Sequence, residues 1–162
     1  MTESSRQHEY EVHVEWTGNR GGGTSGYKAY NRDHVISAGT KRPIEGSADP
    51  AFLGNPARWN PEDLLVASVS ACHKLWYLHL CVEAGVTVTA YVDVALGRMT
   101  EEASGGGYFT GIELRPIVTI ARGGAPTVAT ALHDDAQRMC FIASSLNFPI
   151  TCRPETRVLD GE

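Results

Sequence analysis

One long helical pattern dominates the sequence and limits the folds that the rest of the chain can adopt. Asn60 is a good N-cap, Pro61 suits the first helical position, and Gly85 is typical just beyond a helix C-terminus. These signals predict a helix from Asn60 to about Ala84. Its apolar residues point in most directions, which predicts burial on nearly every side. A helix of this length measures about 36 Å, more than one small domain covers easily, so we expect a homodimer.

Shorter segments with a β pattern flank this helix. Before it, residues 9–16 alternate as a half-buried strand does, and residues 27–31 and 34–38 are two further predicted strands. After it we expect a hairpin, a second helix and a last strand, over residues 86–97 with 108–121, about 127–146 and 148–159, respectively. The order βββ-α-ββ-α-β predicts an α+β fold.

Length and composition predict a single domain over residues 1–162. The chain is 42% hydrophobic with a net charge of −5 and no basic patch, so we expect no nucleic-acid partner. His73 and Lys74 interrupt the most apolar stretch, which argues against a membrane span. The polar residues 1–8 are expected to form a disordered tail. Residues 39–59 contain three prolines and are expected to form a long irregular loop. Because no secretory signal is evident, we expect a cytoplasmic protein.

The four cysteines lack CxxC spacing and are expected to be reduced, and therefore either buried or reactive. Cys81 falls on the helix face opposite to Cys72, and Cys152 alternates with Ile150 in the last strand, so both are expected in the core. Cys72 and Cys140 lie among small residues on the two predicted helices. Small residues let helices approach closely, and these two thiols would then come within disulfide range, although spacing alone does not show it.

Two pairs of cysteine and histidine share a helix face and are candidate metal ligands. His79 follows Cys72, and His133 precedes Cys140, by about 10.5 Å along the helix axis. That separation is too long for both members of a pair to bind one ion at bond lengths of about 2.0–2.3 Å. We therefore expect no metal ligands.

A reactive thiol needs a nearby cation to stabilise its thiolate. His73 and Lys74 follow Cys72 in sequence, but adjacent helical residues face different directions. Arg20, in the glycine-rich turn of residues 18–23, is the better candidate because glycines let that turn approach another element. A solvated turn arginine is the alternative interpretation of Arg20.

Three segments resemble the OsmC/Ohr family, and together they span nearly the whole chain. They are WTGNRGGG at residues 16–23, WNPEDLLVASVSACHKLWYLHLCVEAG at residues 59–85 and HDDAQRMCFIASSLNFPI at residues 133–150. The resemblance implies antiparallel sheets around two central helices in an intertwined homodimer, with the active sites at the subunit interface. It also implies a thiol-dependent peroxidase that reduces organic, lipid-like hydroperoxides.

The resemblance further assigns a role to each candidate site residue. Cys72 resembles the peroxidatic cysteine and Cys140 the resolving one, while Arg20 resembles the arginine that holds the thiolate and Glu62 the carboxylate that orients this arginine. Cys72 would become a sulfenic acid and then form a disulfide with Cys140. The resemblance implies no bound cofactor and an external dithiol reductant, such as a lipoylated protein.

Glu62 and Cys72 lie about 15 Å apart along a straight helix, so they cannot touch directly. A break in the helix, the length of the Arg20 side chain, or contributions from two subunits would reconcile the distance. His73 and Phe141 stand where the best-known members often carry Phe and Pro, respectively.

Two other functions fit the same residues. One is a non-catalytic protein that binds a small apolar ligand, with Cys72 and Cys140 as core residues. The other is a cysteine hydrolase with His73 or His79 as the base, for which no orienting Asp or Asn is evident.

Overall fold

The computed structural model describes residues 5–159, so part of the tail expected at residues 1–8 lies outside the described residues. The chain divides into two compact units, one ending at Glu62 and the other starting at Asp63. Each unit is described by itself below.

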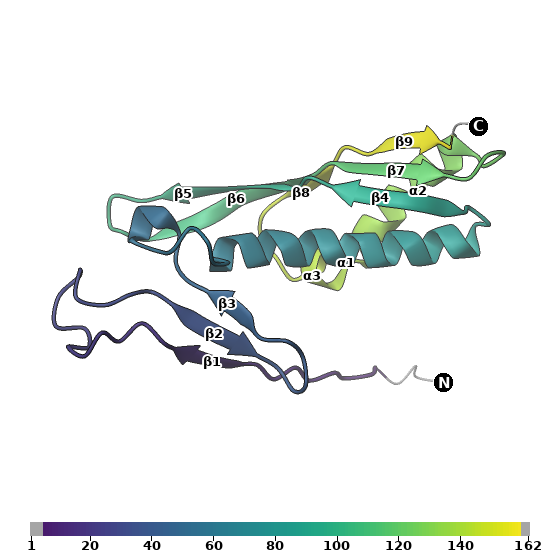
Figure 1. The fold of residues 1–162 in the computed structure, drawn as a ribbon. Helices are drawn as coiled ribbons and strands as arrows, with labels where there is room; N and C mark the ends of the chain where they lie inside the picture. The colour runs from purple at the N-terminus through teal and green to yellow at the C-terminus, as the bar shows by residue number, and fades with distance from the viewer. Residues whose placement is uncertain (1–4, 160–162) are drawn as a thin grey trace. The chain divides into compact units, whose positions relative to one another are not determined.

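The first unit is a small antiparallel sheet followed by irregular chain. Its strands β1 (His13–Trp16), β2 (His34–Ser37) and β3 (Ile44–Gly46) pair in that order (Figure 1). The segment expected to be irregular, residues 39–59, contains β3 and one turn of 3-10 helix, η1 (Pro50–Phe52).

Two predictions for this unit are wrong. β1 is shorter than expected and exposed along its whole length instead of half-buried. Residues 27–31 form turns and bends instead of a strand, because Arg32 donates hydrogen bonds to the carbonyls of Tyr27 and Tyr30 and thereby closes the segment into a loop. The strand expected at residues 34–38 is confirmed as β2.

The long helix α1 (Pro61–Glu83) confirms the central prediction from the sequence. It is continuous, so the proposed break between Glu62 and Cys72 is wrong. Gly85 follows its end with φ of 70°, a left-handed conformation that costs glycine little.

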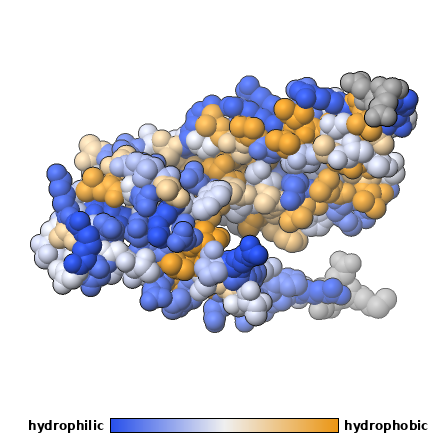
Figure 2. Space-filling view, viewed as in Figure 1, coloured by the Kyte–Doolittle hydropathy of each residue, from blue (hydrophilic) through white to orange (hydrophobic). Residues whose placement is uncertain are grey.

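The prediction that α1 is buried on nearly every side is wrong for the single chain. Its buried residues recur every fourth position and therefore mark one face: Val69, His73, Tyr77 and Cys81. Other apolar side chains remain at the surface, including Leu75 at 63% and Val82 at 77% exposure. Figure 2 shows such hydrophobic side chains, in orange, at the surface of the second unit. By length and composition α1 would also suffice to cross a membrane, a test that core helices of soluble proteins pass as well.

Two three-stranded sheets make up most of the second unit. One has the order β4 (Val88–Asp93), β7 (Pro116–Ile120) and β9 (Glu155–Val158), and the other β5 (Leu96–Glu101), β6 (Gly107–Leu114) and β8 (Ile150–Cys152). The expected hairpin is present as β5 and β6, which pair antiparallel, and β4 pairs antiparallel with β7. β8 and β9 run parallel to β6 and β7, so the sheets are mixed (Figure 1).

Each of the three long β segments predicted from the sequence is two strands, one in each sheet. The segments cross from one sheet to the other near Val94, Arg115 and Arg153. Pro116 and Pro154 lack the N–H that a continuous ladder would need. The Asp93 carboxylate accepts a hydrogen bond from the Arg115 backbone N–H at 2.7 Å, which satisfies that donor at the crossing.

The second predicted helix is interrupted. α2 (Pro126–Met139) ends at Cys140, whose backbone is extended with φ of −69° and ψ of 110°, and the short α3 (Phe141–Ser144) follows. The prediction of one continuous helix over about residues 127–146 is therefore wrong. α1, β7 and α2 share a core made of the following buried residues: Tyr77, Cys81, Val86, Val118, Ile120, Ala129 and Ala136. The α+β class is confirmed.

Candidate active site

The structure brings Cys72 and Cys140 together. Cys72 is half-buried in the middle of α1, and Cys140 is fully buried at the break between α2 and α3. The two thiols are close enough for a hydrogen bond, and both cysteines are free. Two neighbouring thiols are the arrangement from which a disulfide can form.

The surroundings of Cys140 disfavour its thiolate. Burial raises the pKa of Cys140 to about 11, and its hydrogen bond with Cys72 adds to this shift. The backbone N–H of Ala143 donates to the Cys140 sulfur at 3.4 Å, which opposes part of the shift. The Cys140 thiol is therefore almost entirely protonated at neutral pH.

Arg20 lies in the first unit, on the turn that the sequence indicated. Gly21 and Gly23 have φ of 103° and 56°, and the Asn19 side chain accepts hydrogen bonds from both of their N–H groups. The exposed Arg20 guanidinium donates to the backbone carbonyls of Lys28 and Ala29. In this structure Arg20 thus closes its own loop.

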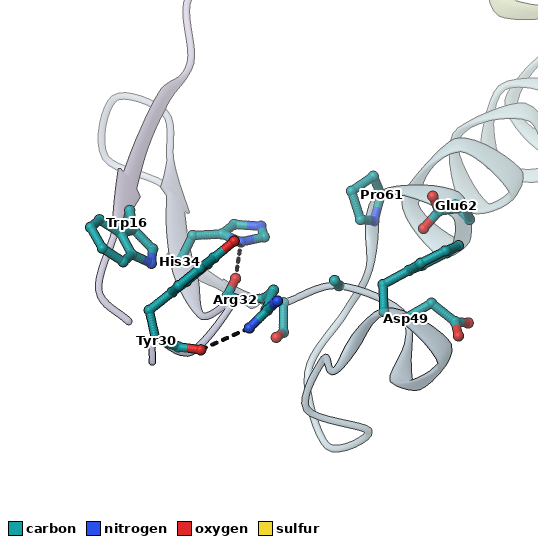
Figure 3. Close-up of a pocket in the computed structure, with 10 residues that line it drawn as sticks. Trp16, Tyr30, Arg32, His34, Asp49, Pro61 and Glu62 are labelled. Atoms are coloured by element: carbon teal, nitrogen blue, oxygen red, sulfur yellow. Dashed lines mark hydrogen bonds between the residues drawn. The ribbon is translucent and has the colours of Figure 1, made fainter. Parts of the chain in front are cut away.

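Glu62 lines a pocket of about 330 Å³ in the first unit, and the arginine in that pocket is Arg32, not Arg20. Figure 3 shows Arg32 in the middle of the group, with Trp16, Tyr30 and His34 on one side and Asp49, Pro61 and Glu62 on the other. The Arg32 guanidinium stacks over two aromatic rings, with its central carbon 4.5 Å from the Tyr27 centroid and 4.2 Å from that of Tyr30.

Arg32 was not among the site residues predicted from the sequence. The glycine-rich turn favours Arg20, whereas Arg32 follows residues 27–31, for which the sequence predicts a strand. Tyr27 and Tyr30, which precede Arg32 at short intervals, were the available signal, because an arginine stacks readily on aromatic faces. The pocket and the cysteine pair belong to different units.

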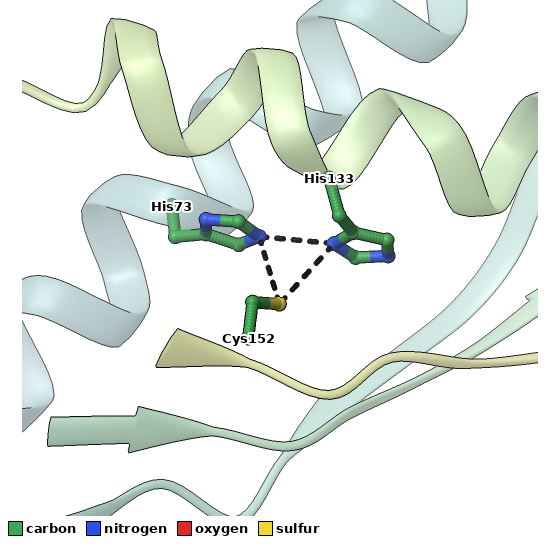
Figure 4. A group of neighbouring side chains, drawn as sticks. All are labelled: His73, His133 and Cys152. Carbon is green, nitrogen blue, oxygen red and sulfur yellow. Dashed lines mark hydrogen bonds between the residues drawn. The ribbon is translucent and has the colours of Figure 1, made fainter. Parts of the chain in front are cut away.

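A second group of side chains was not predicted as a cluster. His73 of α1, His133 of α2 and Cys152 of β8 converge in the second unit (Figure 4). Burial lowers the pKa of His73, and burial with the neighbouring His73 lowers the pKa of His133 to about 3. Burial, with the charges of Asp93 and Asp134, raises the pKa of Cys152 to about 12. All three groups are therefore neutral at pH 7 in this structure.

The other histidine considered as a ligand or a base, His79, lies elsewhere. Its side chain is 58% exposed and its Nε2 atom lies 3.3 Å from the Glu83 carboxylate. It is not part of the cluster of His73, His133 and Cys152.

The family model for OsmC-like protein matches residues 54–155. The chain belongs to the OsmC-like family. This confirms the resemblance, and the matched residues include Glu62, Cys72 and Cys140 but neither Arg20 nor Arg32. No curated protein matches the sequence.

Solved structures of OsmC-like proteins share the fold. One is an OsmC-like protein of unknown function from Vibrio cholerae, at 27% identity and a TM-score of 0.81 over 91% of this chain and 99% of that one. An organic hydroperoxide resistance protein from Elizabethkingia anophelis has 17% identity and a TM-score of 0.66, over 95% of this chain and 100% of that one. A predicted redox protein from Legionella pneumophila, also named as an organic hydroperoxide resistance protein, has 14% identity and a TM-score of 0.66 with the same coverage.

Proposed function

We propose that this OsmC-like protein is a thiol-dependent peroxidase that reduces organic hydroperoxides. The observation that carries the proposal is the contact between the thiols of Cys72 and Cys140. The folds shared with organic hydroperoxide resistance proteins support the reaction class. The alternative, a binding protein with inert core cysteines, gives no reason for two thiols to meet at an interrupted helix.

The reaction runs in three balanced steps. The Cys72 thiolate attacks the terminal oxygen of a hydroperoxide, which forms cysteine sulfenic acid and, after protonation of the leaving alkoxide, an alcohol. The Cys140 thiol then condenses with the sulfenic acid, which forms the disulfide and releases water. An external dithiol, for which a lipoylated protein is our candidate, reduces the disulfide by thiol exchange and is itself oxidised.

The two cysteines are unequal in a way that suits these roles. Cys140 is fully buried with a pKa raised to about 11, so it is a poor first nucleophile. Cys72 is only half-buried, so part of its side chain is exposed. We therefore assign the attack on the peroxide to Cys72 and the resolving step to Cys140.

An arginine is expected to stabilise the Cys72 thiolate and the peroxide oxygen. The resemblance assigns this role to Arg20, with Glu62 as the orienting carboxylate. The pocket favours Arg32, because Arg32 and Glu62 line the same pocket in the first unit. Substitution of each arginine distinguishes these assignments and is taken up in the Discussion.

Mass spectrometry after a single turnover tests the proposal. One equivalent of cumene hydroperoxide should form a Cys72–Cys140 disulfide in the wild type and a stable sulfenic acid on Cys72 in Cys140→Ser. Cys72→Ser should abolish turnover, whereas Cys81→Ala is the matched control, because Cys81 is a free cysteine on the same helix. Unreacted Cys72 and Cys140 in the folded wild type would refute the peroxidase and favour the binding protein.

We also propose that the protein acts as a homodimer. The support is the apolar surface of α1, where Leu75 and Val82 are exposed by 63% and 77% in the single chain. Light scattering coupled to gel filtration should give twice the mass of one chain for the wild type, and Val82→Glu should shift the protein towards monomer. A wild-type protein that elutes as a monomer at all concentrations would refute the dimer.

A further inference from the structure

The cluster of His73, His133 and Cys152 brings three potential metal-ligating atoms together from distant parts of the sequence. His73 Nε2 lies 2.9 Å from His133 Nδ1. Cys152 Sγ lies 3.8 Å from the first nitrogen and 3.9 Å from the second. Figure 4 shows the three side chains pointing toward one another from α1, α2 and β8. Two imidazoles and one thiol are a ligand set that suits zinc.

The fold holds both histidines firmly in the interior. His73 and His133 are each only 1% exposed. The Tyr77 ring stacks on His133 with centroids 3.9 Å apart, so the imidazole has little freedom to turn away. Cys152 is half-buried on the short strand β8, which pairs with β6. Three different elements therefore fix the three ligand atoms.

The cluster is poorly satisfied as a set of hydrogen-bonding groups. Two neutral imidazoles that face each other share one proton in one N–H···N bond. Within residues 5–159, the second nitrogen of each ring, His73 Nδ1 and His133 Nε2, has no hydrogen-bond partner although it is buried. Buried polar groups are normally paired, and an isolated histidine pair offers little compensation for its burial.

The geometry is close to that of a tetrahedral zinc site. With Zn–N bonds of about 2.0–2.1 Å and a Zn–S bond of about 2.3 Å, the two nitrogens would lie about 3.3 Å apart and each about 3.6 Å from the sulfur. The same bonds directed along the ring axes would separate the ring centroids by about 5.2 Å. The observed centroids are 5.2 Å apart with the planes inclined by 6°, a separation that the in-plane hydrogen bond of 2.9 Å also produces. Binding would therefore require both rings to turn within their own planes, so that the nitrogens move from 2.9 Å to about 3.3 Å apart.

Nearby charges also favour a cation. Asp93 lies close enough to act electrostatically on both His73 and Cys152, and Asp134 acts on Cys152. Asp93 itself is anchored by a hydrogen bond from the Ser70 hydroxyl at 2.5 Å and by the Arg115 N–H. Zinc with two neutral imidazoles and one thiolate has one net positive charge, which the Asp93 carboxylate would offset.

We propose that His73 Nε2, His133 Nδ1 and Cys152 Sγ bind one Zn²⁺ ion per chain. Binding exchanges the Cys152 S–H proton for the metal: the zinc–sulfur bond forms, the S–H bond breaks and the proton leaves to solvent. Three protein ligands leave the fourth tetrahedral position for water or another small ligand. The ion would tie α1, α2 and β8 together and hold Cys152 as a zinc thiolate, separate from the Cys72–Cys140 pair.

Cobalt(II) is the most direct probe, because it replaces zinc and reports its own ligands. Tag-free protein treated with a chelator should bind one Co²⁺ per chain, with a thiolate charge-transfer band in the near ultraviolet and visible bands of tetrahedral coordination. One equivalent of Zn²⁺ should remove these bands. Zinc at 100 times its dissociation constant should raise the melting temperature by about 5–10 °C.

Variants locate the site on the chain. Cys152→Ser should lose the charge-transfer band and His133→Gln should lose the tetrahedral bands, whereas Cys81→Ala and Cys72→Ser should keep both. The wild-type titration does not depend on whether a variant folds. No binding of cobalt or zinc at micromolar concentration would overturn the proposal, as would an unchanged band in Cys152→Ser. Uptake of copper(I) but not zinc would overturn the assignment of the ion. Peroxidase turnover is scored separately, so each proposal can fail alone.

Discussion

The raised pKa of Cys140 predicts a disulfide-forming step that is slow at neutral pH and accelerates in alkali. Burial and the hydrogen bond with Cys72 raise the pKa from 9.0 to about 11. The reactive thiolate then falls from about one in a hundred molecules to about one in ten thousand at pH 7. A more basic thiolate is also a better nucleophile. With a Brønsted coefficient of about 0.5, the higher pKa increases the reactivity of each thiolate about tenfold. The net cost is about tenfold in rate relative to an ordinary thiol.

The sign of the pH dependence follows from the same shift. Between pH 7 and 10 the thiolate fraction of Cys140 rises about tenfold per pH unit, and so should the rate of disulfide formation. Trp76 provides the signal, because its ring packs edge-on against Phe141, the residue after Cys140, with centroids 5.5 Å apart. Stopped-flow fluorescence after one equivalent of cumene hydroperoxide, with alkylation and mass spectrometry at matched times, gives the rate.

Cys140→Ser is the control, and its sulfenic acid should persist at every pH in this range. A wild-type rate of disulfide formation that does not change between pH 7 and 9 would refute the reasoning, provided that circular dichroism shows the fold intact. Formation of an equally fast disulfide in Cys140→Ser would refute the assignment of the resolving cysteine.

Three further predictions test the pocket and the packing. Arg32→Ala should lower kcat/KM for cumene hydroperoxide about 100-fold, because Arg32 shares its pocket with Glu62. Arg20→Ala should lower it much less. The reverse order would assign the role to Arg20. Leu114→Ala removes a side chain with 0% exposure and should cost about 2–5 kcal/mol in urea unfolding, while Leu159→Ala, at 49% exposure, should cost under about 1 kcal/mol. Equal costs would contradict the assigned core. A Cβ at Gly54 would lie 1.6 Å from the Ala48 carbonyl oxygen, so Gly54→Ala should make the first unit sensitive to limited proteolysis, while Gly26→Ala, with its nearest neighbour at 3.9 Å, should not; equal sensitivity would show that the close approach does not matter.

The elements that local signals specify were predictable. Asn60, Pro61 and Gly85 bracket α1, and the observed helix runs from Pro61 to Glu83. The strand segments were located as well, but not their division between two sheets. That division depends on pairings between distant segments, such as Ile112 with Ile150 and Ile117 with Glu155, which no local pattern reveals.

The candidate active site was predictable only as far as the family resemblance reached. Motifs around Cys72 and Cys140 indicated the pair, and the structure places the two thiols in contact. The interruption of the helix at Cys140 was missed because the sequence around it, from Met139 to Ala143, carries no proline or glycine. Arg32 was missed because its loop is closed by hydrogen bonds to backbone carbonyls, which every residue type possesses.

The cluster of His73, His133 and Cys152 shows where helical periodicity stops being informative. Two ligands that lie seven residues apart on one helix are too far apart for one ion. The actual cluster takes one residue from each of three elements, and its members are separated by 60 and 19 residues in the chain. What the sequence did contain was His73 four residues from both Val69 and Tyr77, on the buried stripe of α1. A histidine on a buried stripe needs a partner inside the core, and in this fold His133 and Cys152 supply it from two other elements.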